Sequence, residues 1–309
     1  MTAKLGALGA RADVLAGNLE DGVPPERKEA ARAALVRVAR ERELGGATLW
    51  ARVNALDSPW ALDDIVGLIG EAGERIAVLM LPKVEGPWDI HYADRLIAQI
   101  EARAGLSRPV LLHAVIETAL GVVNVEEIAA ASPRMAGMSL GPADLAASRG
   151  MRTTRVGGGH PGYTVLADPG EAGAPRASSL QDLWHHTLAR IVDACAATGI
   201  QPFYGPFGDI ADLAGCEAQF RSAFVMGAVG AWSLHPDQIE VALRVFSPDP
   251  DEVAHARRVL EALPDGGGSA MLDGAFQDDA TWKQCRALVD LAGMLAQRDA
   301  GLATRYGLA

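Results

Sequence analysis

The feature that most constrains the fold of this chain is a regular alternation between short apolar runs and longer amphipathic stretches. The runs are aliphatic or β-branched almost throughout, which is typical of strands covered on both faces. They lie at residues 13–19, 48–53, 76–82, 109–116, 135–141, 201–206 and 230–236. The clearest helical stretch, residues 24–43, starts with proline and has acidic residues early and basic residues late. This alternation predicts a parallel α/β fold.

The spacing between the ends of these runs narrows the fold further. The runs end near Asp21, Asn54, Lys83, Glu117 and Asp144, and the successive separations are 33, 29, 34 and 27 residues. Each is close to the length of one βαβ step. Seven or eight such steps predict a closed (β/α)8 barrel, with a doubly wound sheet as the alternative. No GxGxxG motif follows the first run, so nothing supports a dinucleotide site.

The alternation stops near residue 245, where the composition changes. A helical pattern follows, then the glycine-rich stretch PDGGGS (264–269), then a longer terminal helix. We therefore predict a catalytic barrel domain over residues 1–245 and a C-terminal helical segment over 246–309, joined by a flexible hinge at PDGGGS.

Composition excludes several classes of function. The formal net charge of -11 argues against a nucleic-acid surface and fits a cytoplasmic enzyme. No apolar run approaches the roughly 20 residues of a membrane span, and the N-terminus lacks the apolar region of a signal peptide. The three cysteines are too widely separated to suggest a zinc site or a disulfide framework. We predict a cytoplasmic protein that binds neither nucleic acid nor membrane.

Polar residues collect where the predicted strands end, which is where parallel barrels build their active sites. Glu117 and Asp144 follow neighbouring strands, with no His or Cys nearby in sequence. Two converging carboxylates suit Mg²⁺, whose remaining ligands are substrate and water. For either acid alone, a solvated loop carboxylate is the alternative. The full set is Glu20, Asp21, Arg52, Asn54, Lys83, Glu85, Glu117, Thr118, Asp144 and His235.

Arg52 and Lys83 each allow two interpretations. Arg52 lies in an apolar setting, so its charge must be paired or functional. It forms either a structural salt bridge to Glu20 or Asp21 or part of the catalytic machinery, and Lys83 has the same two options. For His235, a packing role at a strand end is favoured over that of a base.

Two other motifs could be interpreted as a phosphate-binding loop and a metal site, but their local sequence does not favour either function. The run RVGGGHPGY (155–163) lacks the Lys-Ser/Thr of a phosphate loop, so a mobile loop over the barrel mouth is favoured. The adjacent histidines His185 and His186 point about 100° apart on a helix and cannot easily share a metal.

Long ordered motifs along the chain resemble one family. They are NLEDGVPPERKEAAR, RVNALDSPW, MLPKVEGPWDIH, IETALGVVNVEEIAAASPRM, SLGPADLAASRGM, RTTRVGGGHPGY, YGPFGD, GAWSLHPDQI and DDATWKQC. Together they resemble the malyl-CoA lyases, which belong to the HpcH/HpaI aldolase or citrate-lyase β-subunit-like superfamily. The similarity covers nearly the whole chain and is nearest to the branch acting on malyl-CoA, β-methylmalyl-CoA and citramalyl-CoA.

The resemblance implies a TIM barrel with a C-terminal helical lid, assembled as a homo-oligomer. It implies that Glu117 and Asp144 hold Mg²⁺, with Mn²⁺ as a substitute, and that Arg52 supports a developing enolate. It also implies a lid acid supplied by a neighbouring subunit, which matches Asp278, although the adjacent Asp279 leaves a one-residue slip open. Substrate binding is assigned to Lys83, Gly141, Pro142, Ala143, Glu20 and Asp21.

The implied reaction is reversible cleavage of a 3-hydroxyacyl-CoA into glyoxylate or pyruvate and acetyl-CoA or propionyl-CoA. A malyl-CoA thioesterase, an aldolase of free 2-oxo acids and a non-catalytic binding or assembly subunit are the alternatives. One departure from the family stands out, because only seven strands can be counted and the missing strand is the first. A late start codon, a truncation compensated by the oligomer, and an impaired protein all remain open.

Overall fold

The chain forms two compact units in the computed structural model, residues 1–242 and residues 243–309. The structure describes residues 2–168, 170–171 and 173–308.

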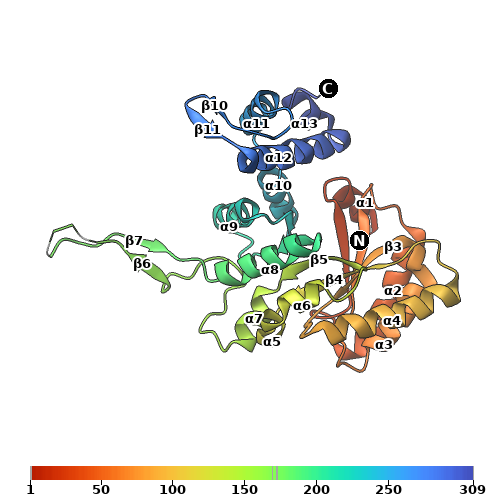
Figure 1. Cartoon of the computed structure of the whole chain (residues 1–309). Helices are drawn as coiled ribbons and strands as arrows, with labels where there is room; N and C mark the ends of the chain where they lie inside the picture. Colours follow the sequence, from red (N-terminus) through yellow and green to blue (C-terminus); the bar gives the residue numbers. More distant parts are fainter. Residues whose placement is uncertain (1, 169, 172, 309) are drawn as a thin grey trace. The chain divides into compact units, whose positions relative to one another are not determined.

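A seven-stranded, fully parallel sheet forms the centre of the first unit (Figure 1). Its order is β1-β2-β3-β4-β5-β8-β9, so the strands of this sheet lie side by side in the order in which they occur along the chain. The strands are β1 (Val14–Asn18), β2 (Thr48–Arg52), β3 (Ile76–Leu81), β4 (Leu111–Ile116), β5 (Met135–Leu140), β8 (Gln201–Tyr204) and β9 (Gly230–Ala231). Each strand lies inside one of the seven predicted runs. The barrel-like fold is therefore confirmed, and its sheet has seven strands where a complete (β/α)8 barrel has eight.

The sheet is strongly curled, as contacts between distant strands show. The rings of Trp50 on β2, His113 on β4 and Phe203 on β8 lie with their centroids 5.1, 5.4 and 5.7 Å apart in pairs. Strands β2 and β8 are four positions apart in the sheet order. In a flat sheet they would be separated by roughly 19 Å, given about 4.8 Å per strand. The sheet therefore wraps around these side chains as an open, barrel-like wall.

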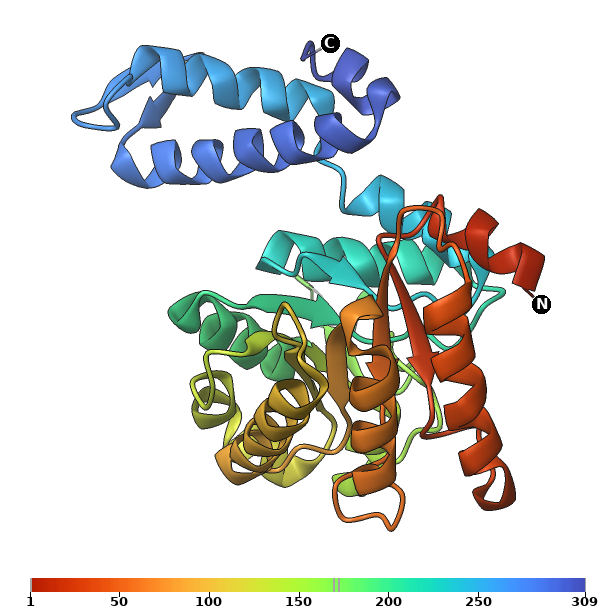
Figure 2. The same ribbon diagram turned by 90° about the vertical axis from the view of Figure 1, so that its right-hand side faces the viewer.

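Helices lie along the outside of this wall, as Figure 2 shows. Their local signals are clear in α4, where proline takes the first position and Gly105 ends the helix in a left-handed conformation with φ of 68°. The helix predicted over 24–43 begins later, at Lys28, after a 3₁₀ turn. The helices are α1 (Thr2–Gly9), α2 (Lys28–Glu41), α3 (Ala61–Ala72), α4 (Pro87–Ala104), α5 (Ala119–Val123), α6 (Val125–Ala129), α7 (Pro142–Ser148), α8 (His185–Thr198), α9 (Leu213–Met226) and α10 (Pro236–Val245).

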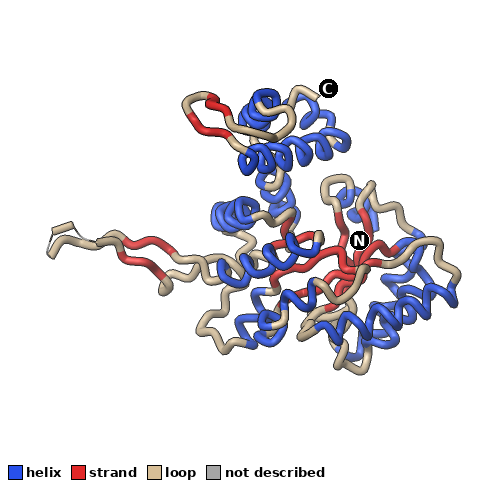
Figure 3. Tube along the Cα trace, viewed as in Figure 1, coloured by secondary structure: helices blue, strands red, loops and turns tan. Residues whose placement is uncertain are grey.

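An antiparallel hairpin projects from the first unit between β5 and α8. Its strands, β6 (Thr164–Leu166) and β7 (Ser178–Leu180), are exposed at every position, and Figure 3 shows them standing away from the sheet. The glycine-rich run before it is anchored, because Gly158 accepts a hydrogen bond from Trp184 Nε1 at 3.0 Å and donates one to the Tyr204 hydroxyl at 3.3 Å. The run predicted to be a mobile loop, residues 155–163, therefore has one anchored glycine, and the hairpin follows it in sequence.

The second unit packs a helical pair around a small core. It contains α11 (Pro250–Ala262), β10 (Ala270–Leu272), β11 (Ala275–Gln277), α12 (Asp279–Arg298) and α13 (Ala300–Arg305). Its core is formed by Val253, Ala292, Leu302 and Tyr306. The PDGGGS stretch connects α11 to β10 inside this unit, so the prediction that it joins the unit to the barrel is wrong. Glycines suit that turn because Gly266 and Gly268 have φ of 69° and 85°.

Within the described residues, no helix combines the length and apolar character needed to cross a membrane. All three cysteines are free thiols, and Cys195 and Cys216 are buried.

Candidate active site

The ends of five neighbouring strands bring most of the predicted site residues together. The Lys83 ammonium contacts the Glu20 carboxylate, and it lies 3.6 Å from Asp21 Oδ2 and 3.5 Å from Asp144 Oδ1. Arg52 Nη1 lies 3.2 Å from Glu20 Oε2. We call this group, completed by Glu117, the rim cluster. Curling of the sheet explains it, because side chains from β1 to β5 converge only on a curved wall.

Glu117 is the most deeply buried acid of the rim cluster, with 3% of its surface exposed. Its Oε1 accepts a hydrogen bond from the Lys83 backbone N–H at 2.9 Å. Its Oε2 faces Gly141, where any added Cβ would collide with it. Gly141 is therefore required for the close approach of the two chain segments, which gives this predicted substrate-binding residue a steric role.

The pKa of Glu117 indicates that negative charge exceeds positive charge around this carboxyl group. Burial, and then the charges of Asp144 and Glu20, raise the pKa of Glu117 to about 8. A second sign is that Glu20 Oε2 is buried without a hydrogen-bond partner, despite its ionic contact with Arg52. Crowded carboxylate oxygens of this kind fit a hard divalent cation. The residues present therefore fit Mg²⁺.

The number of acidic ligands is also consistent with Mg²⁺. Within the described residues, no group of three or more His, Cys, Asp or Glu side chains is arranged to hold a metal ion. Glu117 and Asp144 would supply two protein ligands, and Mg²⁺ commonly takes one or two carboxylates and completes its shell with substrate and water.

Asp144 reaches the cluster from the first turn of α7. Gly141 precedes this helix and Pro142 takes its first position, where the missing N–H is not needed. Pro142 is buried, whereas Ala143 is exposed. These two residues place Asp144 after β5 and bring no polar side chain of their own.

Arg52 is held on three sides. Its Nε donates to Asn18 Oδ1 at 2.9 Å, its Nη1 pairs with Glu20, and its guanidinium carbon lies 5.8 Å from the ring centroid of Trp232. The predicted salt bridge to Glu20 is therefore present. Sequence reasoning missed Asn18 and Trp232. Asn18 could have been noticed as a polar residue near the end of an apolar run, directly opposite Arg52 in the β1–β2 register.

Three other predicted candidates have local roles, and one of them, Thr118, caps α5 by accepting the Gly121 N–H at 2.9 Å. Asn54 is buried in a network, where it accepts from Lys28 Nζ and donates to Asp64 Oδ2, both at 2.5 Å. His235 Nδ1 accepts the Asp237 N–H at 3.3 Å at the start of α10. None of the three side chains contacts the rim cluster in the described hydrogen bonds.

Asp278 belongs to the second unit, where it caps the N-terminus of α12. Its Oδ1 accepts the N–H groups of Ala280 and Thr281 at 3.0 and 3.1 Å. These bonds, with Thr281 first, lower the pKa of Asp278. The neighbouring Asp279 is instead ion-paired with Lys283 at 2.7 Å. The two adjacent acids therefore differ, since Asp278 is fixed by backbone bonds and Asp279 lies on the helix surface.

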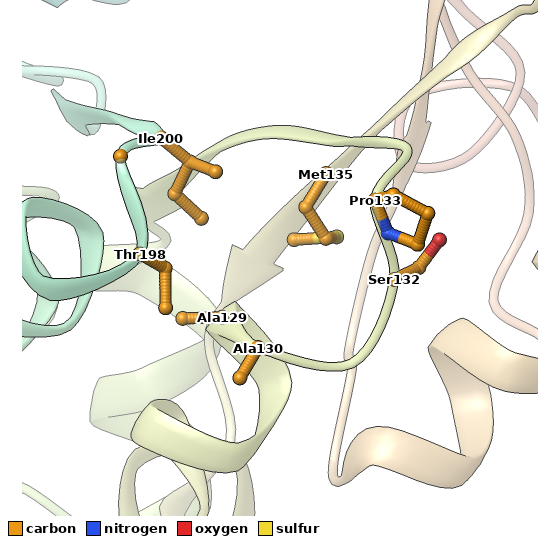
Figure 4. Close-up of a pocket in the computed structure, with 8 residues that line it drawn as sticks. Ala129, Ala130, Ser132, Pro133, Met135, Thr198 and Ile200 are labelled. Carbon is orange, nitrogen blue, oxygen red and sulfur yellow. The ribbon is translucent and has the colours of Figure 1, made fainter.

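A surface cavity of about 450 Å³ lies at the other end of the sheet, near the starts of β5 and β8 (Figure 4). Its lining includes no charged side chain. It is formed by Ala129, Ala130, Ser132, Pro133, Met135, Thr198, Gly199 and Ile200. The cavity therefore offers no group that could do acid, base or metal chemistry.

A parallel, barrel-like sheet with a carboxylate-rich cluster at the carboxyl ends of its strands defines the class of α/β-barrel enzymes. A sequence model of the HpcH/HpaI aldolase/citrate lyase family matches residues 3–236. The chain belongs to this family, which confirms the resemblance and the prediction of an enzyme.

Similar proteins sharpen this assignment. The chain is 59% identical over 306 residues to the malyl-CoA/β-methylmalyl-CoA/citramalyl-CoA lyase of Chloroflexus aurantiacus, covering 99% of this chain and 88% of that protein. It is 40% identical over 289 residues to an L-malyl-CoA/β-methylmalyl-CoA lyase of Cereibacter sphaeroides, with coverage of 92% and 89%. Among solved structures, CitE of Mycobacterium tuberculosis in complex with magnesium, acetoacetate and coenzyme A matches with a TM-score of 0.70, 27% identity and 94% coverage of both chains.

Proposed function

We propose that this protein is a Mg²⁺-dependent carbon–carbon lyase acting on 3-hydroxyacyl-CoA thioesters. The substrates would be malyl-CoA, β-methylmalyl-CoA or citramalyl-CoA, and the products glyoxylate or pyruvate with acetyl-CoA or propionyl-CoA. The observation that carries the proposal is that contacts through Lys83 and Glu20 link Glu117, Asp144 and Arg52 at the rim. The 59% identity to a lyase with these three substrates supports it.

Glu117 and Asp144 would hold the metal ion. Glu117 is already oriented by the Lys83 N–H and by the close approach of Gly141. Bound Mg²⁺ would supply a Lewis acid for the oxygens of the oxo-acid half of the substrate. Mn²⁺ has similar oxygen-ligand chemistry and is expected to substitute.

Arg52 would stabilise the thioester enolate that forms when the carbon–carbon bond breaks. Its contacts with Asn18, Glu20 and Trp232 fix the guanidinium before substrate arrives. A preorganised donor costs no reorganisation during the reaction, and losing one typically reduces the rate about 10²-fold or more.

Asp278 would exchange the proton at the α-carbon of the acyl-CoA. Only Oδ1 takes part in the described helix-capping bonds, which leaves Oδ2 for the substrate. The lowered pKa favours the carboxylate, the form that removes a proton in the condensation direction. We propose further that the second unit acts as a lid over a neighbouring subunit in a cytoplasmic homo-oligomer.

Product analysis with malyl-CoA and Mg²⁺ tests this function. Cleavage of the carbon–carbon bond gives glyoxylate and acetyl-CoA, whereas a thioesterase would give malate and free CoA. We expect the first pair, with activity lost in EDTA and restored by Mg²⁺. Formation of malate and CoA would contradict the proposal, as would the absence of turnover combined with no thermal stabilisation by Mg²⁺, CoA esters or glyoxylate.

A further inference from the structure

Lys83 has a backbone conformation that few residues other than glycine adopt. Its φ is 53°, and among the described residues only Asp273, in the β10–β11 turn, is another non-glycine residue with positive φ. This region is sterically unfavourable for a residue with a Cβ, which lies too close to the following carbonyl oxygen. Strain of this kind persists only where the surroundings enforce it, and it concentrates at functional sites.

The conformation aims both the backbone and the side chain of Lys83 into the rim cluster. Its N–H donates to Glu117 Oε1 at 2.9 Å, while its ammonium contacts Glu20 and lies 3.5 Å from Asp144 Oδ1. One residue just after β3 therefore contacts both proposed metal ligands, Glu117 just after β4 and Asp144 after β5. The left-handed backbone conformation of Lys83 therefore accompanies both contacts, one from its backbone and one from its side chain.

The charges around Lys83 show what its ammonium does. The rim cluster contains four carboxylates, those of Glu20, Asp21, Glu117 and Asp144. Of its two cations, Arg52 contacts Glu20, and Lys83 is the one with described ion pairs to Asp21 and Asp144. Lysine is a cation at neutral pH, so Lys83 brings one positive charge into the middle of these acids.

We propose that Lys83 is a positioning residue that serves as the built-in counter-cation of the metal site. It holds Glu20 and Asp144 in place when no metal is bound, and its positive charge weakens the affinity of the site for a divalent ion. The inference rests on the proposed function, since it assumes that Glu117 and Asp144 hold the metal.

Two consequences follow from electrostatics. Without the ammonium, the carboxylates repel one another, so the metal-free protein should lose stability. The divalent ion no longer meets a positive neighbour, so its dissociation constant should fall on the order of tenfold even with water-like screening. Turnover at saturating Mg²⁺ should nevertheless fall at least about tenfold, because Asp144 and Glu20 lose their positioning contact.

The test uses full-length Lys83→Met and Lys83→Gly, with Arg190→Met as a matched control. Glycine adopts the backbone conformation of residue 83 without strain and keeps the N–H to Glu117. Arg190 forms an ion pair with Glu126 between the outer helices α8 and α6. Melting temperature is measured in EDTA and across a Mg²⁺ titration, calorimetry gives the Mg²⁺ dissociation constant, and steady-state assays give kcat.

We expect both Lys83 variants to melt lower than wild type in EDTA, to bind Mg²⁺ about tenfold more tightly and to gain more stability from it. Lys83→Gly should melt above Lys83→Met in EDTA, and Arg190→Met should show the wild-type Mg²⁺ response. Folded Lys83 variants that bind Mg²⁺ with wild-type or weaker affinity would overturn the inference. Failure of wild type itself to bind Mg²⁺ would instead overturn the proposed function.

Discussion

The two ends of the barrel sheet both carry clusters of charged side chains. The clusters differ in whether each charged group has a partner of opposite charge or a hydrogen bond. At the amino ends of the strands, Arg134 pairs with Asp94 at 2.6 Å and with Glu101 at 2.6 Å, and it also donates to the Val110 carbonyl. At the carboxyl ends, four acids share two cations, and Glu20 Oε2 is buried without a hydrogen-bond partner. The cluster around Arg134 pairs its charges and so holds neighbouring elements together. The rim cluster has more acids than cations, which suits the binding of a cation.

The largest expected effect is on catalysis at the rim. Glu117→Gln keeps the size of the side chain and removes the charge of a proposed metal ligand. We expect kcat/KM to fall at least about 10³-fold with the fold retained, since both metal binding and charge stabilisation depend on it. Circular dichroism checks the fold and a malyl-CoA cleavage assay checks activity. Activity within tenfold of wild type would remove Glu117 from the metal site.

The next prediction concerns the free energy of unfolding, which should depend on pH because of Glu117 in the rim cluster. The unfolded carboxyl of Glu117 titrates near 4.5 and the folded one near 8. Between these values the unfolded chain releases a proton that the metal-free folded chain keeps. This group therefore destabilises the folded protein progressively as pH rises from about 4.5 to 8, by up to about 5 kcal/mol over the whole interval.

Urea unfolding in EDTA at pH 5.5 and 8.5 measures this difference. Glu117→Gln should lose less stability than wild type over the interval, because glutamine does not titrate. Identical losses in the two proteins would show that burial and Asp144 do not raise the pKa of Glu117.

At the other end of the sheet, breaking the satisfied cluster should cost stability and spare the chemistry. Arg134→Met leaves Asp94 and Glu101, both partly buried, without their cation. We expect a loss of about 2–3 kcal/mol in the free energy of unfolding, at the low end for a buried pair because solvent reaches these groups. Urea titration measures the loss, and kcat per folded molecule should stay within twofold of wild type. A large fall in kcat would mean that the two ends are coupled.

The smallest of these effects concerns packing at the rim. Gly141→Ala introduces a methyl group that collides with Glu117, which must then shift. We expect a weaker Mg²⁺ affinity, by about tenfold, and a stability loss of about 1–2 kcal/mol. Gly70→Ala, in the outer helix α3 where an added Cβ meets only the Ile100 side chain at 3.9 Å, is the matched control and should leave Mg²⁺ affinity unchanged. Equal affinities in both variants would show that Gly141 is not needed for the position of Glu117.

Much of this contrast could be predicted from the sequence, because βαβ spacing alone decides which residues follow each strand. Arg52, Lys83, Glu117 and Asp144 were predicted at one rim, and the structure brings them together. The positive φ of Lys83 could not be predicted, since no local signal distinguishes it from an ordinary strand end. The acids that Lys83 contacts in this conformation, Glu20, Glu117 and Asp144, all lie far away in sequence.

The errors in the sequence analysis have physical causes as well. PDGGGS has the composition of a linker, yet its glycines form a tight turn inside the second unit. The mobility predicted for RVGGGHPGY stays a prediction, but the hydrogen bonds of Gly158 to Tyr204 and Trp184, which lie beyond the hairpin in sequence, could not be predicted from its glycine content. Glycine-rich composition describes conformational freedom and cannot show which distant side chains remove it.

The claim on which the account depends is that Glu117 and Asp144 bind one divalent ion. A crystal of the protein soaked with Mn²⁺ and oxalate, an analogue of the oxo-acid product, would test it through the anomalous signal of manganese. We predict one strong anomalous peak within bonding distance of a carboxylate oxygen from each residue, with oxalate completing the shell beside Arg52. A peak bound by other side chains, or no peak at the rim at saturating Mn²⁺, would contradict the account.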